Sequence, residues 1–390
     1  MDMTVEKTFF TLLRYELNGA HICDDVKNFI TSATLIELFK LSKKHDLVHL
    51  IANALEKNKL FSEDQNIKKR FIQERNLAIF RYEQQRYELE RICATLENAK
   101  ISFIPLKGVV IREYYPEPWM RTSCDIDILV QEKELDKAAD MLCEELGYKK
   151  EDKRSANELS LYTDSGVHLE LHYDLTEGNK YGAEILSNVW KYALLKENNN
   201  HHYLLTNEFF YYYHIAHMVK HFENGGCGVR TFLDLWLINK YVSFNEEKSE
   251  ELLKESGFLQ FEQASKKLAG VWFNQLDLDE LTSRLADYIL VGGIYGSIQN
   301  MVSIQQAKKG GKVKYILSRI FISNKELKIK YPILQKRPYL IPFYHVKRWI
   351  KPLTQKESNK RSMGVLTETS SVKSEDKKSK EKLLADLGLK

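Results

Sequence analysis

The run CDIDILV at residues 124–130 alternates acidic and aliphatic side chains. Because successive side chains of a β-strand point to opposite faces of its sheet, this period of two predicts a strand. Asp125 and Asp127 then share one face, and the aliphatic side chains turn toward a core on the other. Two carboxylates on one strand repel each other unless a cation lies between them. On its own the pattern suits either a metal site or two solvent-facing acids on an edge strand, and the strand that follows in the chain favours the metal site.

A second run, VHLELH at residues 167–172, alternates in the same way. Its apolar residues share one face, and His168, Glu170 and His172 share the other. If the two strands are neighbours, Glu170 lies beside the two aspartates. Three carboxylates with open coordination positions suit Mg²⁺ or Mn²⁺, which bind nucleotide phosphates. The predicted metal-binding and catalytic residues are Asp125, Asp127 and Glu170.

The residues around these two strands predict a compact mixed α/β unit. The expected elements are a strand at 101–106, a helical turn at 109–114, a helix at 132–146 and a strand at 158–163. Gly147 follows the helix as its expected C-cap. Asp164-Ser165-Gly166 is typical of a tight hairpin turn between the last two strands. Cys124 falls on the aliphatic face of its strand and is expected to be a core thiol.

Helical patterns flank this unit on both sides. Residues 66–100 contain neither Gly nor Pro, and their apolar residues recur every three or four positions, which predicts one long amphipathic helix. Further helices are expected at 208–222, 229–242, 247–255, 258–272 and 277–289. The predicted fold class is α+β, with a small mixed β-sheet core flanked by N-terminal and C-terminal helical regions. The predicted parts are a helical region at 1–100, the α/β core at 101–200, a helical domain at 201–305, a basic aromatic-rich segment at 306–351 and a disordered tail at 352–390 with a weak helix at 379–387.

The composition is that of an ordinary globular protein, with 43% hydrophobic and 29% charged residues. The five cysteines are scattered and show no CxxC spacing, which argues against a disulfide framework or a zinc ribbon and favours a reducing compartment. The N-terminus does not resemble a signal peptide, and no apolar run is long enough to span a membrane. These features predict a cytoplasmic protein.

Positive charge is concentrated late in the chain. Sixteen Lys or Arg residues lie between Lys308 and Arg361 against two acidic residues, so the rest of the chain is net acidic. An acidic body argues against nucleic acid as the partner. The basic and aromatic residues at 308–351 suit peripheral contact with an anionic membrane. They equally suit contact with an acidic partner or RNA, or a packing segment whose lysines are solvated.

Five motifs of the core follow one another in a recognisable order. They are Leu106-Lys107-Gly108, Tyr114-Tyr115, Arg121, Asp125-Ile126-Asp127-Ile128-Leu129-Val130 and Glu170-Leu171-His172. The pattern continues through His214, His217, Lys220, His221, Arg230 and Asp234. The sequence thereby resembles the polymerase-β-like nucleotidyltransferase superfamily. More narrowly, it resembles a bacterial group of nucleotidyltransferases associated with surface-polysaccharide or peptide-modification gene clusters.

The resemblance implies a nucleotidyltransferase core and a role for each matched residue. The two aspartates would ligate the metal, and Glu170 would be the third acid. Gly108 would let the backbone approach the triphosphate, and Lys107 would lie near phosphate. The wider superfamily usually has Gly-Ser or Gly-Gly at this turn, whereas Val109 follows the glycine here. The phosphate contact would therefore rest on Lys107 or Arg121.

Histidines add to the candidate site. His168 and His172 flank the glutamate of their strand, where one of them orients it or accepts a proton. His217 and His221 lie four residues apart on an expected helix with Lys220 between them, but the glutamate of a zinc HExxH motif is absent. Contact with nucleotide or acceptor, and ordinary helix packing, are the open alternatives for this helix. The predicted cofactor-binding residues are Lys107, Gly108, Arg121, His172, His217, Lys220 and His221.

Together these features predict a metal-dependent enzyme that transfers a nucleoside monophosphate from an NTP, with ATP the expected donor, to an acceptor hydroxyl and releases pyrophosphate. The acceptor is expected to be a small molecule, a glycan or a peptide. Two alternatives belong to other classes: a catalytically inactive nucleotide-binding regulatory module, and a tRNA-directed nucleotidyltransferase toxin. The complete set of three acids argues against the first, and the acidic body of the chain argues against the second.

Overall fold

The computed structural model of the chain describes residues 3–61, 64–151, 155, 157–176, 181–294, 296–320, 324, 327, 331, 333–354 and 374–389. The chain forms two compact units. The first combines Met1–His217 with Val229–Leu278, and the second combines Met218–Gly228 with Asp279–Lys390. The five-part division expected from the sequence remains a prediction.

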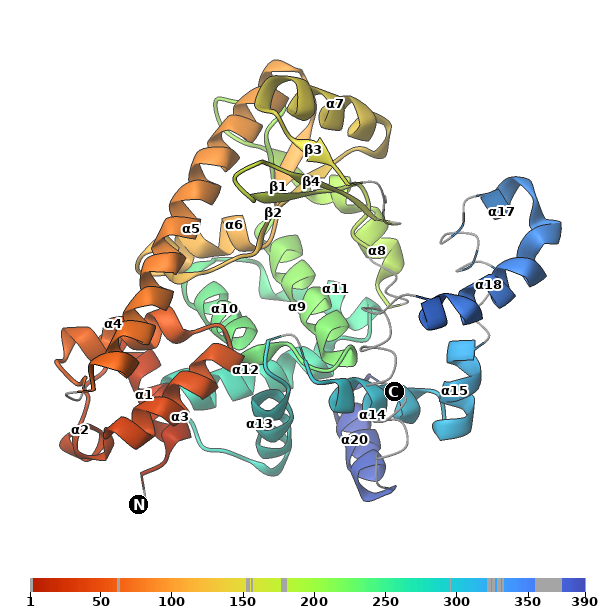
Figure 1. Cartoon of the computed structure of the whole chain (residues 1–390). Helices are drawn as coiled ribbons and strands as arrows, with labels where there is room; N and C mark the ends of the chain where they lie inside the picture. The colour runs from red at the N-terminus through yellow and green to blue at the C-terminus, as the bar shows by residue number, and fades with distance from the viewer. Residues whose placement is uncertain are drawn as a thin grey trace. The chain divides into compact units, whose positions relative to one another are not determined.

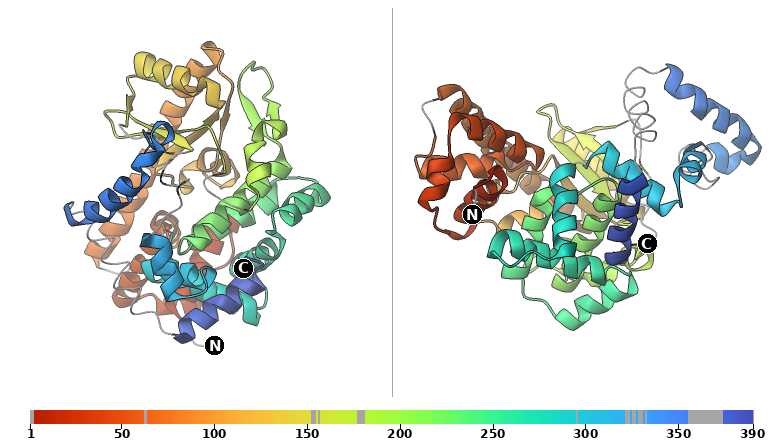
Figure 2. Two further views of the ribbon diagram at one scale, coloured as in Figure 1. Left: turned by 90° about the vertical axis from the view of Figure 1, so that its right-hand side faces the viewer. Right: turned by 90° about the horizontal axis from the view of Figure 1, so that it is seen from below.

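The first unit begins with a group of helices (Figures 1 and 2). They are α1 (Val5–Asn18), α2 (Asp24–Phe29), α3 (Ser32–Lys44), α4 (Val48–Lys57) and α5 (Gln65–Asn98). Helix α5 is a single element of 34 residues, as its freedom from Gly and Pro predicts. The Asp64 side chain caps it by accepting hydrogen bonds from the backbone N–H groups of Asn66 and Ile67.

The first unit contains a five-stranded mixed sheet, which includes the two strands with the acidic residues. Its strands are β1 (Phe103–Pro105), β2 (Asp125–Val130), β3 (Lys149–Lys150), β4 (Glu158–Tyr162) and β5 (His168–His172), in the order β1-β2-β5-β4-β3. Strands β2 and β5 are parallel neighbours, and the other adjacent pairs are antiparallel. Their register places Asp127 opposite Glu170 and Asp125 opposite His168. This small mixed sheet between helical regions confirms the predicted α+β class.

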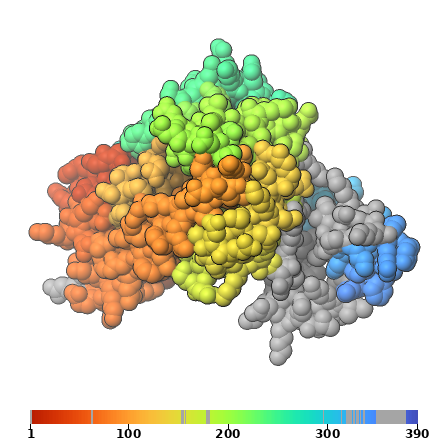
Figure 3. Space-filling model, turned by 90° about the horizontal axis from the view of Figure 1, so that it is seen from above, coloured from red at the N-terminus to blue at the C-terminus, as the bar shows by residue number. Residues whose placement is uncertain are grey.

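One face of the sheet packs against α5 and α7 (Leu135–Leu146), which lie side by side in Figures 1 and 3. Apolar residues of these helices form one core with Ile126, Ile128 and Val130 of β2 and with the leucines of β4 and β5. Gly147 ends α7 in the left-handed conformation, with φ at 75°, which confirms the predicted C-cap. Because this face is filled by helices, the polar side chains of β2 and β5 lie on the opposite face.

Short elements connect and extend the sheet. Between β1 and β2 the chain forms α6 (Gly108–Ile111), η1 (Arg112–Tyr114) and η2 (Pro118–Met120), and η3 (Glu132–Glu134) precedes α7. A second, two-stranded sheet pairs β6 (Ala193–Leu195) with β7 (Tyr203–Leu205), and α8 (Ala183–Ser187) and η4 (Val189–Tyr192) precede it. The Phe103 N–H donates to the carbonyl of His201 at 2.9 Å, so this second sheet adjoins the edge of β1.

The expected C-terminal helices are present to within three residues at each end. They are α9 (Asn207–Glu223), α10 (Gly228–Tyr241), α11 (Glu246–Glu255), α12 (Leu259–Asn274) and α13 (Glu280–Gly292). The second unit continues with α14 (Ile298–Lys308), α15 (Lys312–Ile320), α17 (Ile333–Lys336), η5 (Pro338–Leu340), α18 (Ile341–Thr354) and α20 (Ser374–Asp386).

Helix α20 includes most of the range where a weak helix was expected. Its Asp386 pairs with Arg284 of α13 at 2.6 Å, and Leu383 and Leu384 are buried. Residues 355–373 of the expected disordered tail lie outside the described residues. None of the described helices combines the length and the apolar content that a membrane crossing requires.

Candidate functional site

Asp127 lies at the middle of the polar face and is buried. Its Oδ1 accepts a hydrogen bond from Lys107 Nζ at 2.9 Å and another from His172 Nε2 at 2.7 Å. Burial disfavours the carboxylate, but Lys107 and His172 outweigh it and hold the pKa of Asp127 well below its usual range. Asp127 is therefore an anion that two cationic side chains already compensate.

Glu170 faces Asp127 across the two strands, and His172 links them. His172 Nε2 lies 3.4 Å from Glu170 Oε2 as well as bonding to Asp127. Burial and the nearby Lys107 lower the pKa of His172, but its contacts with the two carboxylates raise it to about 9. The potential ligand atoms of Asp127, Glu170 and His172 all lie within 4.8 Å of one another.

Asp125 begins β2 and forms a second group with His168 and Glu170, whose potential ligand atoms also lie within 4.8 Å of one another. Ser123 Oγ donates to Asp125 Oδ1 at 2.9 Å. Burial and the negative charges of Asp127 and Glu170 raise the pKa of Asp125. The three carboxylates thus bring more negative charge to the site than Lys107 and His172 neutralise. These residues therefore fit a divalent cation.

The Lys107-Gly108 turn directs a positive charge at the carboxylates. Lys107 has φ at 48° and ψ at −119°, a region that residues with side chains rarely adopt. A Cβ on Gly108 would lie 2.9 Å from Arg121 Nη1 and 3.0 Å from Ser123 Oγ. A side chain at this position would therefore have to displace the Arg121 or Ser123 side chain. The expected approach of Gly108 to a triphosphate remains a prediction.

Arg121 is engaged by a carboxylate of α10. Its Nη2 and Nε lie 3.0 Å and 3.3 Å from the two oxygens of Asp234, and the Tyr115 hydroxyl donates to the same carboxylate at 2.6 Å. Asp234 is 1% exposed. This buried pair joins the β1–β2 connection to the helices that follow the sheet. A phosphate contact by Arg121 stays a prediction, whereas Lys107 and His172 both contact the Asp127 carboxylate directly.

The predicted residues of α9 divide between the two units. His217 lies in the first unit, 6.3 Å from the ring of Tyr213, and Lys220 and His221 lie in the second. All three are half-buried, and their contact with nucleotide or acceptor remains a prediction. The prediction for Cys124 was wrong: its side chain is exposed, because β2 begins at Asp125 and the alternation of strand faces does not extend to the bend before it.

Two residues of β4 were not anticipated for this site. In the β4–β5 register, Glu158 lies opposite His172 and Tyr162 lies opposite His168. Glu158 Oε2 is 3.6 Å from His172 Nδ1. The sequence could have predicted both pairs, because the hairpin turn at Asp164-Ser165-Gly166 sets the register of the two strands. Counting residues outward from this turn places Tyr162 opposite His168 and Glu158 opposite His172.

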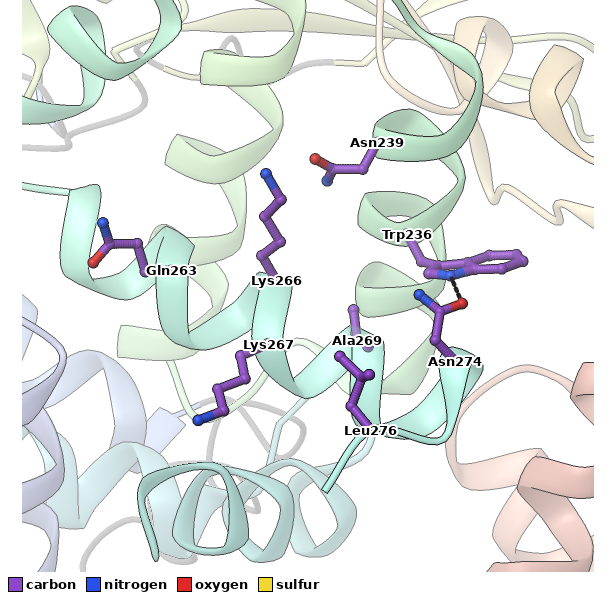
Figure 4. A pocket seen from close by; sticks show the side chains of 9 residues that line it. Trp236, Asn239, Gln263, Lys266, Lys267, Ala269, Asn274 and Leu276 are labelled. Atoms are coloured by element: carbon purple, nitrogen blue, oxygen red, sulfur yellow. Dashed lines mark hydrogen bonds between the residues drawn. The ribbon is translucent and has the colours of Figure 1, made fainter. Parts of the chain in front are cut away.

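A separate hollow of about 430 Å³ lies between α10 and α12 (Figure 4). Trp236 donates to Asn274 Oδ1 at 2.9 Å within it. Its lining residues are Trp236, Asn239, Gln263, Lys266, Lys267, Ala269, Gly270, Asn274 and Leu276. None of these belongs to the strands that carry the carboxylates, so the hollow is not part of the acidic site.

Comparison with known proteins bears on this geometry. A family described as "Uncharacterised nucleotidyltransferase" matches residues 32–274, which include the whole sheet and the helices from α3 to α12. A search of the curated proteins finds no match.

Asp234→Asn is expected to lower the free energy of unfolding by about 3–5 kcal/mol, because it leaves the Arg121 guanidinium buried beside a neutral partner. Chemical denaturation of the full chain measures this loss. Asp164→Asn is the matched control, since Asp164 is an exposed carboxylate paired with Lys149 and should cost less than about 1 kcal/mol. Equal losses in the two variants would contradict the structural role of the Arg121 pair.

Without divalent metal, the chain is expected to lose stability as the pH rises from about 6.5 to about 9. Folded His172 keeps its proton up to the higher value, whereas an unfolded imidazole releases it near the lower one. Because the pKa is raised in the folded chain, the protonated imidazole contributes its full stabilisation below the pKa of the unfolded state. This stabilisation is lost as the pH rises through the pKa of the folded state. Each pH unit between the two pKa values is worth about 1.4 kcal/mol.

Thermal denaturation in EDTA at pH 6.5 and pH 9 tests this expectation. The melting temperature of the wild type should fall by several degrees between the two, and the fall should be much smaller in His172→Gln. The same fall in both proteins would show that His172 does not carry the effect.

Proposed function

The chain belongs to the uncharacterised nucleotidyltransferase family, and from this premise we propose that it transfers a nucleoside monophosphate from an NTP to an acceptor hydroxyl and releases pyrophosphate. The observation that carries the proposal is the parallel register of β2 and β5, with Asp127 opposite Glu170. In this proposal Asp125, Asp127 and Glu170 hold Mg²⁺ or Mn²⁺. A divalent cation bound there supplies positive charge against the triphosphate and lowers the pKa of the acceptor hydroxyl.

The side chains around the carboxylates have distinct parts in this reaction. Lys107 neutralises phosphate charge, because its ammonium group lies at the site, 2.9 Å from Asp127 Oδ1. Glu170 accepts the proton of the acceptor hydroxyl while the hydroxyl oxygen bonds to the α-phosphorus and the bond to the β-phosphate breaks. His172 keeps Asp127 and Glu170 in their relative positions by contacting both. The rate then comes mainly from positioning and charge neutralisation.

Several finer features rest on the sequence alone. ATP as the donor, a small molecule, glycan or peptide as the acceptor, and a cytoplasmic location are proposals of this kind. The contributions of Arg121, His217, Lys220 and His221 to ligand binding have the same standing, as does the bacterial origin that the resemblance suggests.

Asp125→Asn and Asp127→Asn are each expected to lower transfer by at least about 100-fold, because each removes one charge from the cation site. The assay incubates the full chain with Mg²⁺ or Mn²⁺, each labelled NTP in turn and a panel of acceptors, and follows pyrophosphate. Asp164→Asn again serves as the matched control and should retain full activity. Retention of activity by both site variants would refute the assignment of the carboxylates.

The same assay separates the other candidate functions. NTP binding without pyrophosphate release from any acceptor would favour a nucleotide-binding regulatory module. Transfer of the label to tRNA in this assay would favour a tRNA-directed toxin, and such a toxin should also arrest growth on expression unless Asp125→Ala is present. Either outcome would contradict transfer to a small molecule, glycan or peptide.

Peripheral contact between an anionic membrane and the basic segment at 308–351 is a second proposal. Tyr339, Phe343 and Val346 follow helical spacing along η5 and α18 and are 72%, 61% and 46% exposed. Lys347 lies beside them, with its Nζ 5.3 Å from the ring of Tyr344. Exposed apolar residues bordered by lysine and arginine are typical of helices that lie in the surface of an anionic bilayer.

Sedimentation with vesicles tests this contact. The chain should bind phosphatidylserine-containing vesicles more than phosphatidylcholine vesicles, and added salt should weaken the binding because the attraction is electrostatic. Phe343→Ser should reduce binding, whereas Phe80→Ser, at a comparably exposed phenylalanine of α5 outside this segment, should not. Equal binding to both kinds of vesicle, or equal effects of the two substitutions, would contradict the proposal.

A further inference from the structure

His168 has no part in the reaction described above, although it lies among the residues assigned to it. It is the first residue of β5, and the strand registers place it between Asp125 of β2 and Tyr162 of β4. Its ring therefore lies on the polar face, next to the carboxylate that begins β2.

The Tyr162 ring fixes the orientation of this histidine. The two rings stack at a centroid distance of 4.4 Å with only 4° between their planes. Such a stack limits rotation of the imidazole about its own axis. The ring is held with Nε2 4.0 Å from Glu170 Oε1.

That nitrogen is buried and has no hydrogen-bond partner among the described residues. A buried polar atom without a partner costs roughly 1–3 kcal/mol, so its persistence requires an explanation. Potential ligand atoms of Asp125 and Glu170 lie within 4.8 Å of a ring nitrogen of His168. Two ligands on opposite sides of one ion are about 4 Å apart, because each bond is about 2.0–2.2 Å long. A cation bound between Asp125, His168 and Glu170 would give the imidazole nitrogen a partner, and the ligand atoms would need to move only slightly closer together.

We propose that His168 is a metal ligand together with Asp125 and Glu170, and that its imidazole makes this site bind Mn²⁺ in preference to Mg²⁺. The proposal rests on the function proposed above and specifies the ion. Mg²⁺ takes oxygen ligands almost exclusively, whereas imidazole nitrogen binds first-row transition ions more strongly. The carboxylates keep the site suited to an octahedral ion with room for phosphate oxygens, which Mn²⁺ provides.

Electron paramagnetic resonance of Mn²⁺ added to the full chain tests the proposal without an activity assay. The loss of the free Mn²⁺ signal gives the dissociation constant, and competition gives that of Mg²⁺. Pulsed measurements detect an isotropic ¹⁴N coupling when a nitrogen is bound to the ion. The wild type should bind Mn²⁺ at least about tenfold more tightly than Mg²⁺ and should show ¹⁴N coupling.

His168→Phe keeps an aromatic ring stacked on Tyr162 and removes the nitrogen. It should weaken Mn²⁺ binding at least about tenfold, leave Mg²⁺ binding nearly unchanged, and abolish the ¹⁴N coupling. His21→Phe makes the same substitution at an exposed histidine outside the site and should change none of these. If His168→Phe does not fold, His172→Gln decides the origin of the coupling: ¹⁴N coupling that persists in this variant comes from His168, whereas its loss would assign the bound nitrogen to His172.

The outcomes separate this inference from the proposed function. Mn²⁺ that binds without ¹⁴N coupling, or whose coupling persists in His168→Phe, would overturn the role of His168 and leave a carboxylate metal site intact. Absence of binding by both Mn²⁺ and Mg²⁺, with or without NTP, would overturn the metal site itself and with it the proposed function.

Discussion

The repulsion between carboxylates on two paired strands is the constraint on which the rest of the site depends. Parallel pairing of β2 with β5 fixes Asp127 opposite Glu170, and Asp125 lies two residues away on the same face. Like charges this close raise the free energy of the folded chain unless cations approach them. Lys107 and His172 supply the positive charge at Asp127 and lower the pKa of this carboxyl group. At Asp125 the negative charges dominate, and its pKa is raised. The imbalance at Asp125 supports the proposal that the site binds a metal ion.

The surrounding structure positions these charged side chains at the expense of backbone strain. Lys107 occupies a backbone conformation with positive φ, which costs on the order of 1–3 kcal/mol for a residue with a side chain. The glycine after it leaves space for Arg121, whose guanidinium is clamped by Asp234 of α10. The helices beyond the sheet therefore contribute to the site through this buried pair. Such strain supported by packing is common where a side chain must be positioned for chemistry.

The sequence predicted the parts of this arrangement that depend on local periodicity. Strand alternation gave the shared face of Asp125 and Asp127, and Gly- and Pro-free runs gave the long helices. It did not predict contacts that depend on packing between distant segments, such as the pair of Arg121 with Asp234. Alternation also failed at Cys124, because periodicity does not say where a strand begins. The short strands β3, β6 and β7 were missed because two or three residues are too few for a period of two to be recognised, and no apolar run marks them as one marks the equally short β1.

A crystal of the full chain grown with Mn²⁺ and a non-hydrolysable NTP tests the central claim most directly. Anomalous scattering identifies manganese independently of the rest of the electron density. The account predicts an anomalous peak bound by Asp125, Asp127 and Glu170, with the triphosphate beside Lys107. A nucleotide bound elsewhere, or manganese bound by none of these three carboxylates, would contradict it.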